Sequence, residues 1–146
     1  MEESLTLLKL IKRDFGLGEV DLRTLSPLTL AFVGDCVYDL ILRTVIVERH
    51  NASPNQQHRE KSRLAKAPAQ AEMAEALQEH LTQEEIAVYR RGRNAKSHTT
   101  AKNASVLDYR KATGLEALYG WLYLSGQEER LLQLIRLSLD VLGWRL

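Results

Sequence analysis

With 146 residues, 45% of them hydrophobic and 27% charged, the chain has the length and balance of one globular domain. The net charge of +1 at neutral pH indicates no class of partner by itself. A single cysteine excludes an internal disulfide, the acidic start is unlike a signal peptide, and no apolar run approaches the roughly 20 residues of a membrane span. We therefore expect a cytoplasmic protein.

Hydrophobic spacing and capping residues predict helices along the whole chain. The first is an amphipathic segment in which Leu5, Leu8 and Ile11 share one face, followed by a turn-rich stretch from residue 14 to 21. Ser26-Pro27 and Ser53-Pro54 each place a capping serine before a proline, a usual opening of a helix. We expect those two helices to run to about residue 50 and through residue 66.

The second half of the chain predicts four further helices. After Pro68, an alanine-rich helix runs to about residue 80. Thr82 and Glu85 form a capping box that opens a short helix, which stops near Gly92. Residues 92–105 are polar and loop-like, and apolar helices follow over about 106–124 and 128–142. Strand-like alternation is nearly absent, so the predicted class is all-α, with roughly six to eight helices.

Two acidic residues, Asp35 and Glu116, interrupt segments that are otherwise apolar nearly all round, residues 31–38 and 114–122. Both helices should be largely buried, and a buried carboxylate is costly unless a cation, a metal ion or hydrogen bonds compensate it. Gly34 and Gly114, beside or near these acids, predict the close approach of another backbone or a ligand. The two acids could therefore converge on one divalent cation, which would activate water for phosphoryl transfer.

Other interpretations of these acids stay open. Each could instead pair with an arginine, for which Arg43, Arg110 and Arg130 are available. Asp39, one turn after Asp35 on the same face, either supports the cation site through water or is a surface charge. Cys36 has apolar neighbours and is expected to be a packed thiol. The four histidines lack metal-binding spacing, which argues against a zinc hydrolase.

A basic stretch leads into the Glu116 helix. Residues 90–111 contain seven Lys or Arg residues and one acid, Asp108, together with small polar side chains. Such a loop suits contact with a phosphate backbone, and a solvated surface loop is the alternative. Few aromatic residues lie among the charges, so recognition of a duplex by its shape is favoured over stacking on a single strand.

Four segments of the chain resemble the catalytic domain of the ribonuclease III family. Residues 32–37 (FVGDCV) resemble the family signature Phe-Leu-Gly-Asp-Ala-Val, and residues 113–120 (TGLEALYG) resemble its second acidic motif. Residues 91–96 (RGRNAK) and 109–113 (YRKAT) are similar to the Mini-ribonuclease III branch of the family. The resemblance extends from about residue 25 to 139, and we expect residues 1–146 to form a single domain without a double-stranded-RNA-binding domain.

The resemblance implies an all-α ribonuclease III-like fold, a homodimer, and a magnesium-dependent endoribonuclease in which manganese can replace magnesium. Asp35 and Glu116 would be the catalytic residues and metal ligands, and cleavage of double-stranded RNA would leave 5′-phosphate ends. The Mini branch implies a duplex in precursor large-subunit (23S) ribosomal RNA as the substrate. The implied RNA-binding residues are Arg91, Arg93, Asn94, Lys96, Ser97, Lys102 and Asn103.

The chain departs from the larger relatives at two acidic positions. They carry a glutamate where this chain has Ala31, and an aspartate where it has Thr113. The resemblance therefore implies a first cation site through Asp35 and Glu116, and it leaves open whether one or two ions act. Thr113 could contribute its hydroxyl through water. The alternative function is a non-catalytic RNA-binding module of the same fold.

Overall fold

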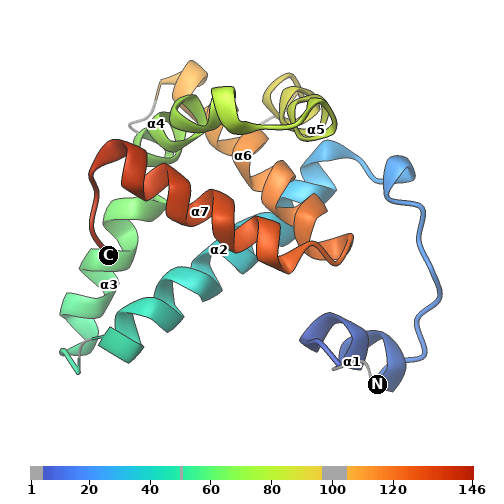
Figure 1. Ribbon diagram of the computed structural model, residues 1–146, viewed down its shortest axis with the longest axis horizontal. Coiled ribbons are helices and arrows are strands. Elements are labelled where there is room, and N and C mark those ends of the chain that lie inside the picture. The colour runs from blue at the N-terminus through green and yellow to red at the C-terminus, as the bar shows by residue number, and fades with distance from the viewer. Residues whose placement is uncertain (1–4, 50, 97–104) are drawn as a thin grey trace.

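The computed structural model describes residues 5–49, 51–96 and 105–146, and these residues form helices and no strands. The described part contains seven α-helices and two short 3-10 helices (Figure 1). In chain order they are α1 (Leu7–Asp14), η1 (Leu22–Thr24), α2 (Pro27–Arg49), α3 (Pro54–Ala65), α4 (Ala67–Leu77), η2 (Gln78–His80), α5 (Gln83–Arg93), α6 (Val106–Leu124) and α7 (Glu128–Leu142). The all-α class predicted from the sequence is confirmed.

Capping residues account for the helix boundaries. The side chain of Ser53 accepts a hydrogen bond from the backbone N–H of Gln56, and the side chain of Gln56 accepts one from the backbone N–H of Ser53. Helix α3 therefore begins with a reciprocal capping box. Thr82 and Glu85 form the same arrangement at the start of α5, as the sequence predicted. α7 ends at Gly143, which has a φ of 67° and adopts the left-handed conformation that favours glycine at this position.

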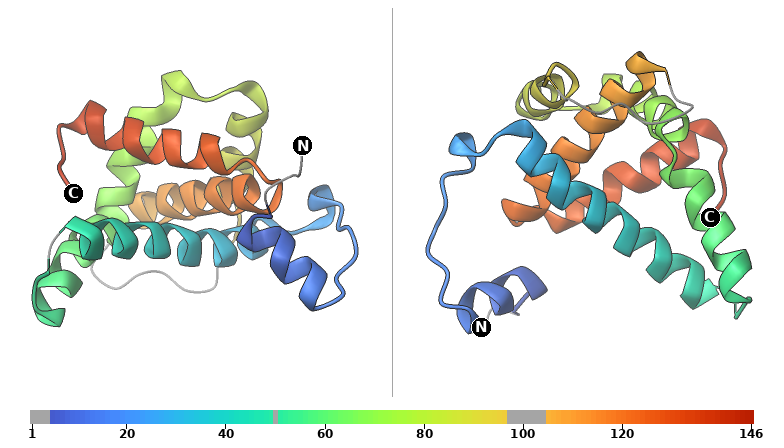
Figure 2. Two further views of the ribbon diagram at one scale, coloured as in Figure 1. Left: turned by 60° about the horizontal axis from the view of Figure 1, so that its bottom comes forward. Right: turned by 180° about the vertical axis from the view of Figure 1, so that it is seen from behind.

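Helix α6 lies at the centre of the molecule, and α2, α4, α5 and α7 pack around it (Figures 1 and 2). This position explains why the second half of α6 is apolar nearly all round, because most residues from Ala112 to Leu122 are buried. The larger core cluster joins α6 to α2, α4 and α7, and it includes Leu42, Met73, Leu118 and Leu134. A smaller cluster, where α5 meets α2 and α6, includes Ala31, Val88 and Ala117.

One face of α2 is not covered by the other residues that the structure describes. Leu28, Phe32, Cys36, Leu40 and Val47 follow one another along this face at helical spacing and are exposed, Phe32 to 80%. We call these five residues the α2 stripe. The prediction that Cys36 is a packed thiol is therefore wrong, because its side of the helix faces away from α6.

Helix α1 stands apart from the other helices and is joined to them by an extended segment (Figure 1). In α1, the side chain of Leu8 is buried, whereas that of Leu7 is exposed. Among the described helices, none combines the length and apolar character needed to cross a lipid bilayer.

Candidate active site

Glycines bring the backbones of α2 and α6 into contact where these two helices cross. A Cβ atom on Gly34 would lie 1.7 Å from the backbone oxygen of Glu116. A Cβ atom on Gly120 would lie 1.9 Å from the backbone oxygen of Leu30. Neither position has room for a side chain, so both glycines are required by close approach. The close approach predicted for Gly34 is confirmed, and Gly120, one turn after Glu116, carried the same signal in the sequence but was missed.

The crossing places the carboxyl groups of Asp35 and Glu116 side by side. Asp35 follows Gly34 directly, and Glu116 is the residue whose backbone Gly34 contacts. Burial, together with the hydrogen bond to Asp35 and the negative charge of Asp35, raises the pKa of Glu116 to about 9. Glu116 is half-buried, whereas Asp35 is exposed. The two acids that the sequence singled out therefore converge at one edge of the helix crossing.

The chemistry of this pair fits a divalent cation. Hard cations such as Mg²⁺ prefer carboxylate oxygens and are commonly held by one or two of them, with water in the other positions. The raised pKa of Glu116 means that its charge is poorly compensated by the protein. In the described part of the chain, no group of three or more His, Cys, Asp or Glu side chains is placed to hold a metal ion, so the donor set here is two carboxylates.

The arginines proposed as alternative partners are mostly engaged elsewhere. Arg43 bonds to Asp39, with 2.6 Å between Nε and Oδ2, and Arg130 bonds to Glu85. Arg110 is exposed on α6. No ion pair within the described residues involves Asp35 or Glu116. Pairing of either acid with one of these three arginines is therefore not seen among the described residues.

The remaining acidic and polar candidates lie around this pair. Asp39, one turn after Asp35, forms ion pairs with both Arg43 and Lys61. Thr113, one turn before Glu116, is buried and its hydroxyl donates to the backbone oxygen of Tyr109 at 3.0 Å. Ala31 is buried in the smaller apolar cluster, so the position that carries glutamate in larger relatives belongs to the core here.

A tyrosine pair supports the crossing from within the core. Tyr38 and Tyr119 stack with ring centroids 5.6 Å apart, one from α2 and one from α6. The hydroxyl of Tyr38 donates to the backbone oxygen of Leu64 at 2.8 Å. Burial raises the pKa of Tyr38, and the nearby Glu116 carboxylate raises it further, so Tyr38 stays neutral and lies close to the acidic pair. This contact ties α2 to α3 behind the candidate site.

The end of α5 presents the described members of the predicted RNA-binding set. Arg91 and Lys96 are exposed, and Arg91 lies near the start of α2, 3.5 Å from the backbone oxygen of Leu25. Arg93 lies over the ring of Tyr89, 5.8 Å from its centroid, and Asn94 caps the helix. The other predicted members, Ser97, Lys102 and Asn103, lie outside the described residues.

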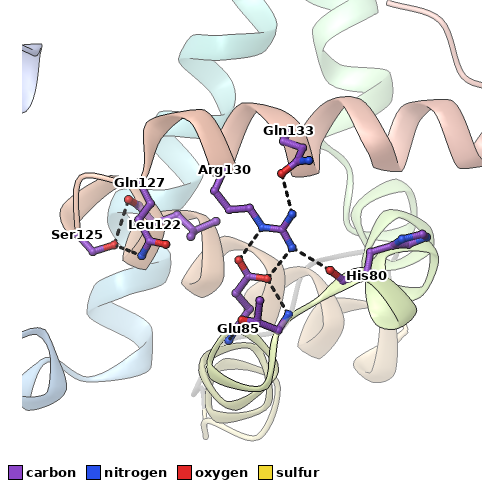
Figure 3. Close-up of polar contacts among 8 residues, drawn as sticks. His80, Glu85, Leu122, Ser125, Gln127, Arg130 and Gln133 are labelled. Carbon is purple, nitrogen blue, oxygen red and sulfur yellow. Dashed lines mark hydrogen bonds and ion pairs between the residues drawn. The ribbon is translucent and has the colours of Figure 1, made fainter.

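Two contacts fix α5 on the body of the protein. Gly92 packs against α6, where a Cβ atom would lie 2.7 Å from the Cβ of Ala117. Near its other end, Glu85 is only 3% exposed and forms two hydrogen bonds with Arg130 of α7, at 2.8 and 2.9 Å (Figure 3). Arg130 also donates to the backbone oxygen of His80 at 2.8 Å.

The pairing of Glu85 with Arg130 was not predicted, although Glu85 was identified as a capping residue. Nothing in the sequence signals this contact, because the two residues are 45 positions apart and meet only in the folded chain. Arg130 and the backbone of Thr82 lower the pKa of Glu85, whose carboxylate therefore stays ionised although it is buried.

Comparisons with known proteins agree with this architecture. The family described as Ribonuclease III domain matches residues 28–127. A Mini-ribonuclease 3 of Clostridium tetani is 42% identical over 134 residues, 88% of this chain and 89% of that protein. A Mini-ribonuclease 3 of Thermoanaerobacter is 50% identical over 119 residues, 82% of this chain and 84% of that protein. A solved structure of a Fusobacterium nucleatum protein, 26% identical, has a TM-score of 0.76 and covers 84% of this chain and 98% of that one.

The helical fold and a match that spans more than half of the chain define the class, so this chain belongs to the ribonuclease III family. Within the family it groups with the Mini-ribonuclease 3 proteins. The resemblance inferred from the sequence motifs is thereby confirmed. The chain is a ribonuclease III-type endoribonuclease, of the class that acts on double-stranded RNA.

Proposed function

We propose that this chain cleaves double-stranded RNA with the help of Mg²⁺ held by Asp35 and Glu116. The observation that carries the proposal is the side-by-side placement of these two carboxyl groups, with the pKa of Glu116 raised to about 9. Two adjacent carboxylates that form no ion pair with a described residue suit a divalent ion. Mn²⁺, which also accepts oxygen ligands, is expected to replace Mg²⁺.

The residues of the proposed site have different roles. When bound, the divalent ion would supply an activated water and stabilise charge that develops on the scissile phosphate. Asp35 and Glu116 hold that ion at the crossing of α2 and α6, where the backbone contact at Gly34 keeps both carboxyl groups in register. Hydrolysis in this manner leaves 5′-phosphate and 3′-hydroxyl ends. Thr113 lies one turn from Glu116 and is a candidate to support the site through water.

The end of α5 is the proposed contact for the RNA backbone. Arg91 is exposed on α5 and Lys96 is exposed just beyond its end, with Arg93 and Asn94 between them, and this arrangement supports contact with phosphate groups. Replacing Arg91 and Lys96 by glutamine should weaken binding of all duplex sequences and flatten its salt dependence by about one unit of slope per lost contact. An unchanged slope of log K against log salt would remove α5 from the RNA interface.

Exposed apolar residues support the proposed homodimer. The α2 stripe leaves Phe32 80% exposed beside Asp35, where water contact with an aromatic ring is unfavourable. Contact between two copies around Phe32 and Cys36 would cover the exposed ring and set two acidic pairs in one assembly, and it would leave the Val47 end of the stripe open. Each pair would then cut one strand of a duplex.

Resemblance to the Mini branch supports a duplex in precursor 23S ribosomal RNA as the natural substrate, which assigns the chain to ribosome biogenesis. The same resemblance, together with the single cysteine, supports action in the cytoplasm. Both assignments concern where the chain acts rather than how its site works.

A cleavage assay with a matched variant tests the proposed function. Labelled duplex RNA is incubated with the wild type and with Asp35→Asn, each in Mg²⁺ and in chelator. We expect cleavage by the wild type in Mg²⁺ alone, and a loss of at least about a thousandfold in the variant, whose helix content and melting temperature stay near those of the wild type. Cleavage by Asp35→Asn at the wild-type rate would refute the assignment of the site.

A further inference from the structure

A cationic cavity lies between α2 and α3, and neither Asp35, Glu116 nor any residue of α5 lines it. Its volume is about 190 Å³, and Arg43, His58, Lys61 and Gln57 line it together with apolar residues of α2. Pro54, Gln57, His58 and Lys61 line the cavity from one face of α3. Three of the lining side chains can donate hydrogen bonds from charged or titratable nitrogens.

Asp39 holds two of these cations in place. Its Oδ2 accepts from Arg43 Nε at 2.6 Å, and its Oδ1 lies 3.2 Å from Lys61 Nζ. Among the described contacts, those of Arg43 and Lys61 leave the terminal nitrogens of Arg43 and two of the three ammonium protons of Lys61 for a further acceptor. The three residues carry a net charge of +1, so an anion at this point gains attraction.

The position of this cluster relates it to the reaction. Asp39 follows Asp35 by four residues, which is about one helical turn and about 6 Å along the axis of α2. Helix α2 therefore carries Asp35, the candidate metal ligand, and one turn later Asp39, which binds the side chains of Arg43 and Lys61. We take the strand cut at Asp35 to run along α2, so that its neighbouring phosphates pass this turn.

From this geometry we infer that Arg43 and Lys61, held by Asp39, form a second contact for the RNA phosphate backbone. The cavity takes a phosphate group that flanks the scissile one, and His58 is one of the residues that line it. The inference rests on the proposed function, because it assumes that RNA lies across Asp35. It differs from the α5 contact in using other helices and another side of the site.

Binding and kinetics with Arg43→Gln and Lys61→Gln test this contact. The side chain of Arg43 is 60% exposed and that of Lys61 is 16% exposed, so Arg43→Gln is the variant less prone to disturb the fold. The matched control is Arg136→Gln, which removes one positive charge from an exposed position of α7. Helix content and melting temperature are recorded for each variant.

For each of the two variants we expect the dissociation constant for a 20-base-pair RNA duplex in chelator to rise by about three- to tenfold. The slope of log K against log salt should fall by about one unit. In Mg²⁺, KM should rise while kcat stays near that of the wild type, because the contact holds substrate and transition state equally. Arg136→Gln should change none of these quantities.

A duplex with a single neutral methylphosphonate locates the contact. The methylphosphonate is placed at successive positions along one strand. At one position next to the cleavage site it should weaken binding of the wild type, and at that same position it should not weaken the binding of Arg43→Gln any further. If Arg43→Gln and Lys61→Gln bind and cleave like Arg136→Gln, the cluster only braces α3 against α2 and the inference is overturned. A wild type that binds the duplex without cutting it would overturn the proposed function. The comparison of dissociation constants would still show whether Arg43 and Lys61 contact the RNA.

Discussion

The backbone oxygen of Glu116 lies where a side chain of residue 34 would begin, 1.7 Å from a Cβ atom built on Gly34. This contact sets the distance between α2 and α6 and thereby the distance between Asp35 and Glu116. The glycine and the two acids form one structural unit, because a wider helix crossing would separate the carboxyl groups.

Gly34→Ala should therefore be strongly destabilising. The new methyl group meets backbone atoms, which cannot rotate away, so we expect a loss of about 3 kcal/mol or more in the free energy of unfolding. Gly18→Ala is the matched control, since nothing lies within 4 Å of a Cβ atom there. Urea denaturation of both variants measures the difference, and equal midpoints would contradict the tight crossing.

The acidic pair should make the metal-free protein less stable as the pH rises. The pKa of Glu116 is raised from 4.5 to about 9, so between these values the folded chain keeps a proton that the unfolded chain releases. Stability contributed by the protonated carboxyl is present at low pH and is lost as the pH rises toward 9. Glu116→Gln removes this dependence.

Melting temperatures of wild type and Glu116→Gln, measured in chelator from pH 5 to pH 8.5, check this dependence. We expect the variant to melt higher, by a margin that widens with pH. Addition of Mg²⁺ should raise the melting temperature of the wild type and leave that of the variant nearly unchanged. Parallel curves for the two proteins across the pH range would show that Glu116 is not held protonated.

The contact between Glu85 and Arg130 should contribute strongly to stability. Arg130→Gln leaves a buried carboxylate without its cation, and we expect a loss of about 3–5 kcal/mol at pH 7. The pKa of Glu85 is lowered by Arg130, so the stabilisation is present above the unfolded value of 4.5 and is lost as the pH falls through the lower folded value. Urea denaturation should thus show a gap to the wild type that narrows in acid. Arg136→Gln, at an exposed position, should stay within about 0.5 kcal/mol of wild type.

The α2 stripe predicts how the chain associates. Light scattering should give twice the mass of one chain at micromolar concentration, and Phe32→Gln should shift the mass toward that of one chain without loss of helix content. Val20→Gln is the control, because Val20 is also an exposed apolar residue but lies outside the helices. A wild type that is monomeric under these conditions would remove the dimer from the account.

Local signals in the sequence were sufficient for the helices. Ser53 and Thr82 mark helix starts through their own backbone contacts, so the boundaries of α3 and α5 follow from a few neighbouring residues. The two acids were conspicuous because a carboxylate in an apolar helix needs compensation, and Gly34 indicated a close neighbour. These features depend on residues within one or two turns of each other.

Features that depend on distant residues were not predictable in this way. The pairing of Glu85 with Arg130 depends on how α7 returns to α5. Cys36 was expected to be packed because its neighbours in the sequence are apolar, yet an apolar helix face can be covered either by its own chain or by a second chain. Hydrophobic pattern alone does not distinguish these two kinds of cover.

The most direct test of the account is calorimetric titration of Mg²⁺ into the wild-type protein, repeated in two buffers with different ionisation enthalpies. We predict binding at one site per chain with release of protons, because Glu116 is protonated near neutral pH until the ion binds. Asp35→Asn and Glu116→Gln should each abolish the binding heat. Binding that persists in both variants, or a wild type that binds no Mg²⁺ at millimolar concentration, would contradict the assignment of these two carboxylates as the cation site.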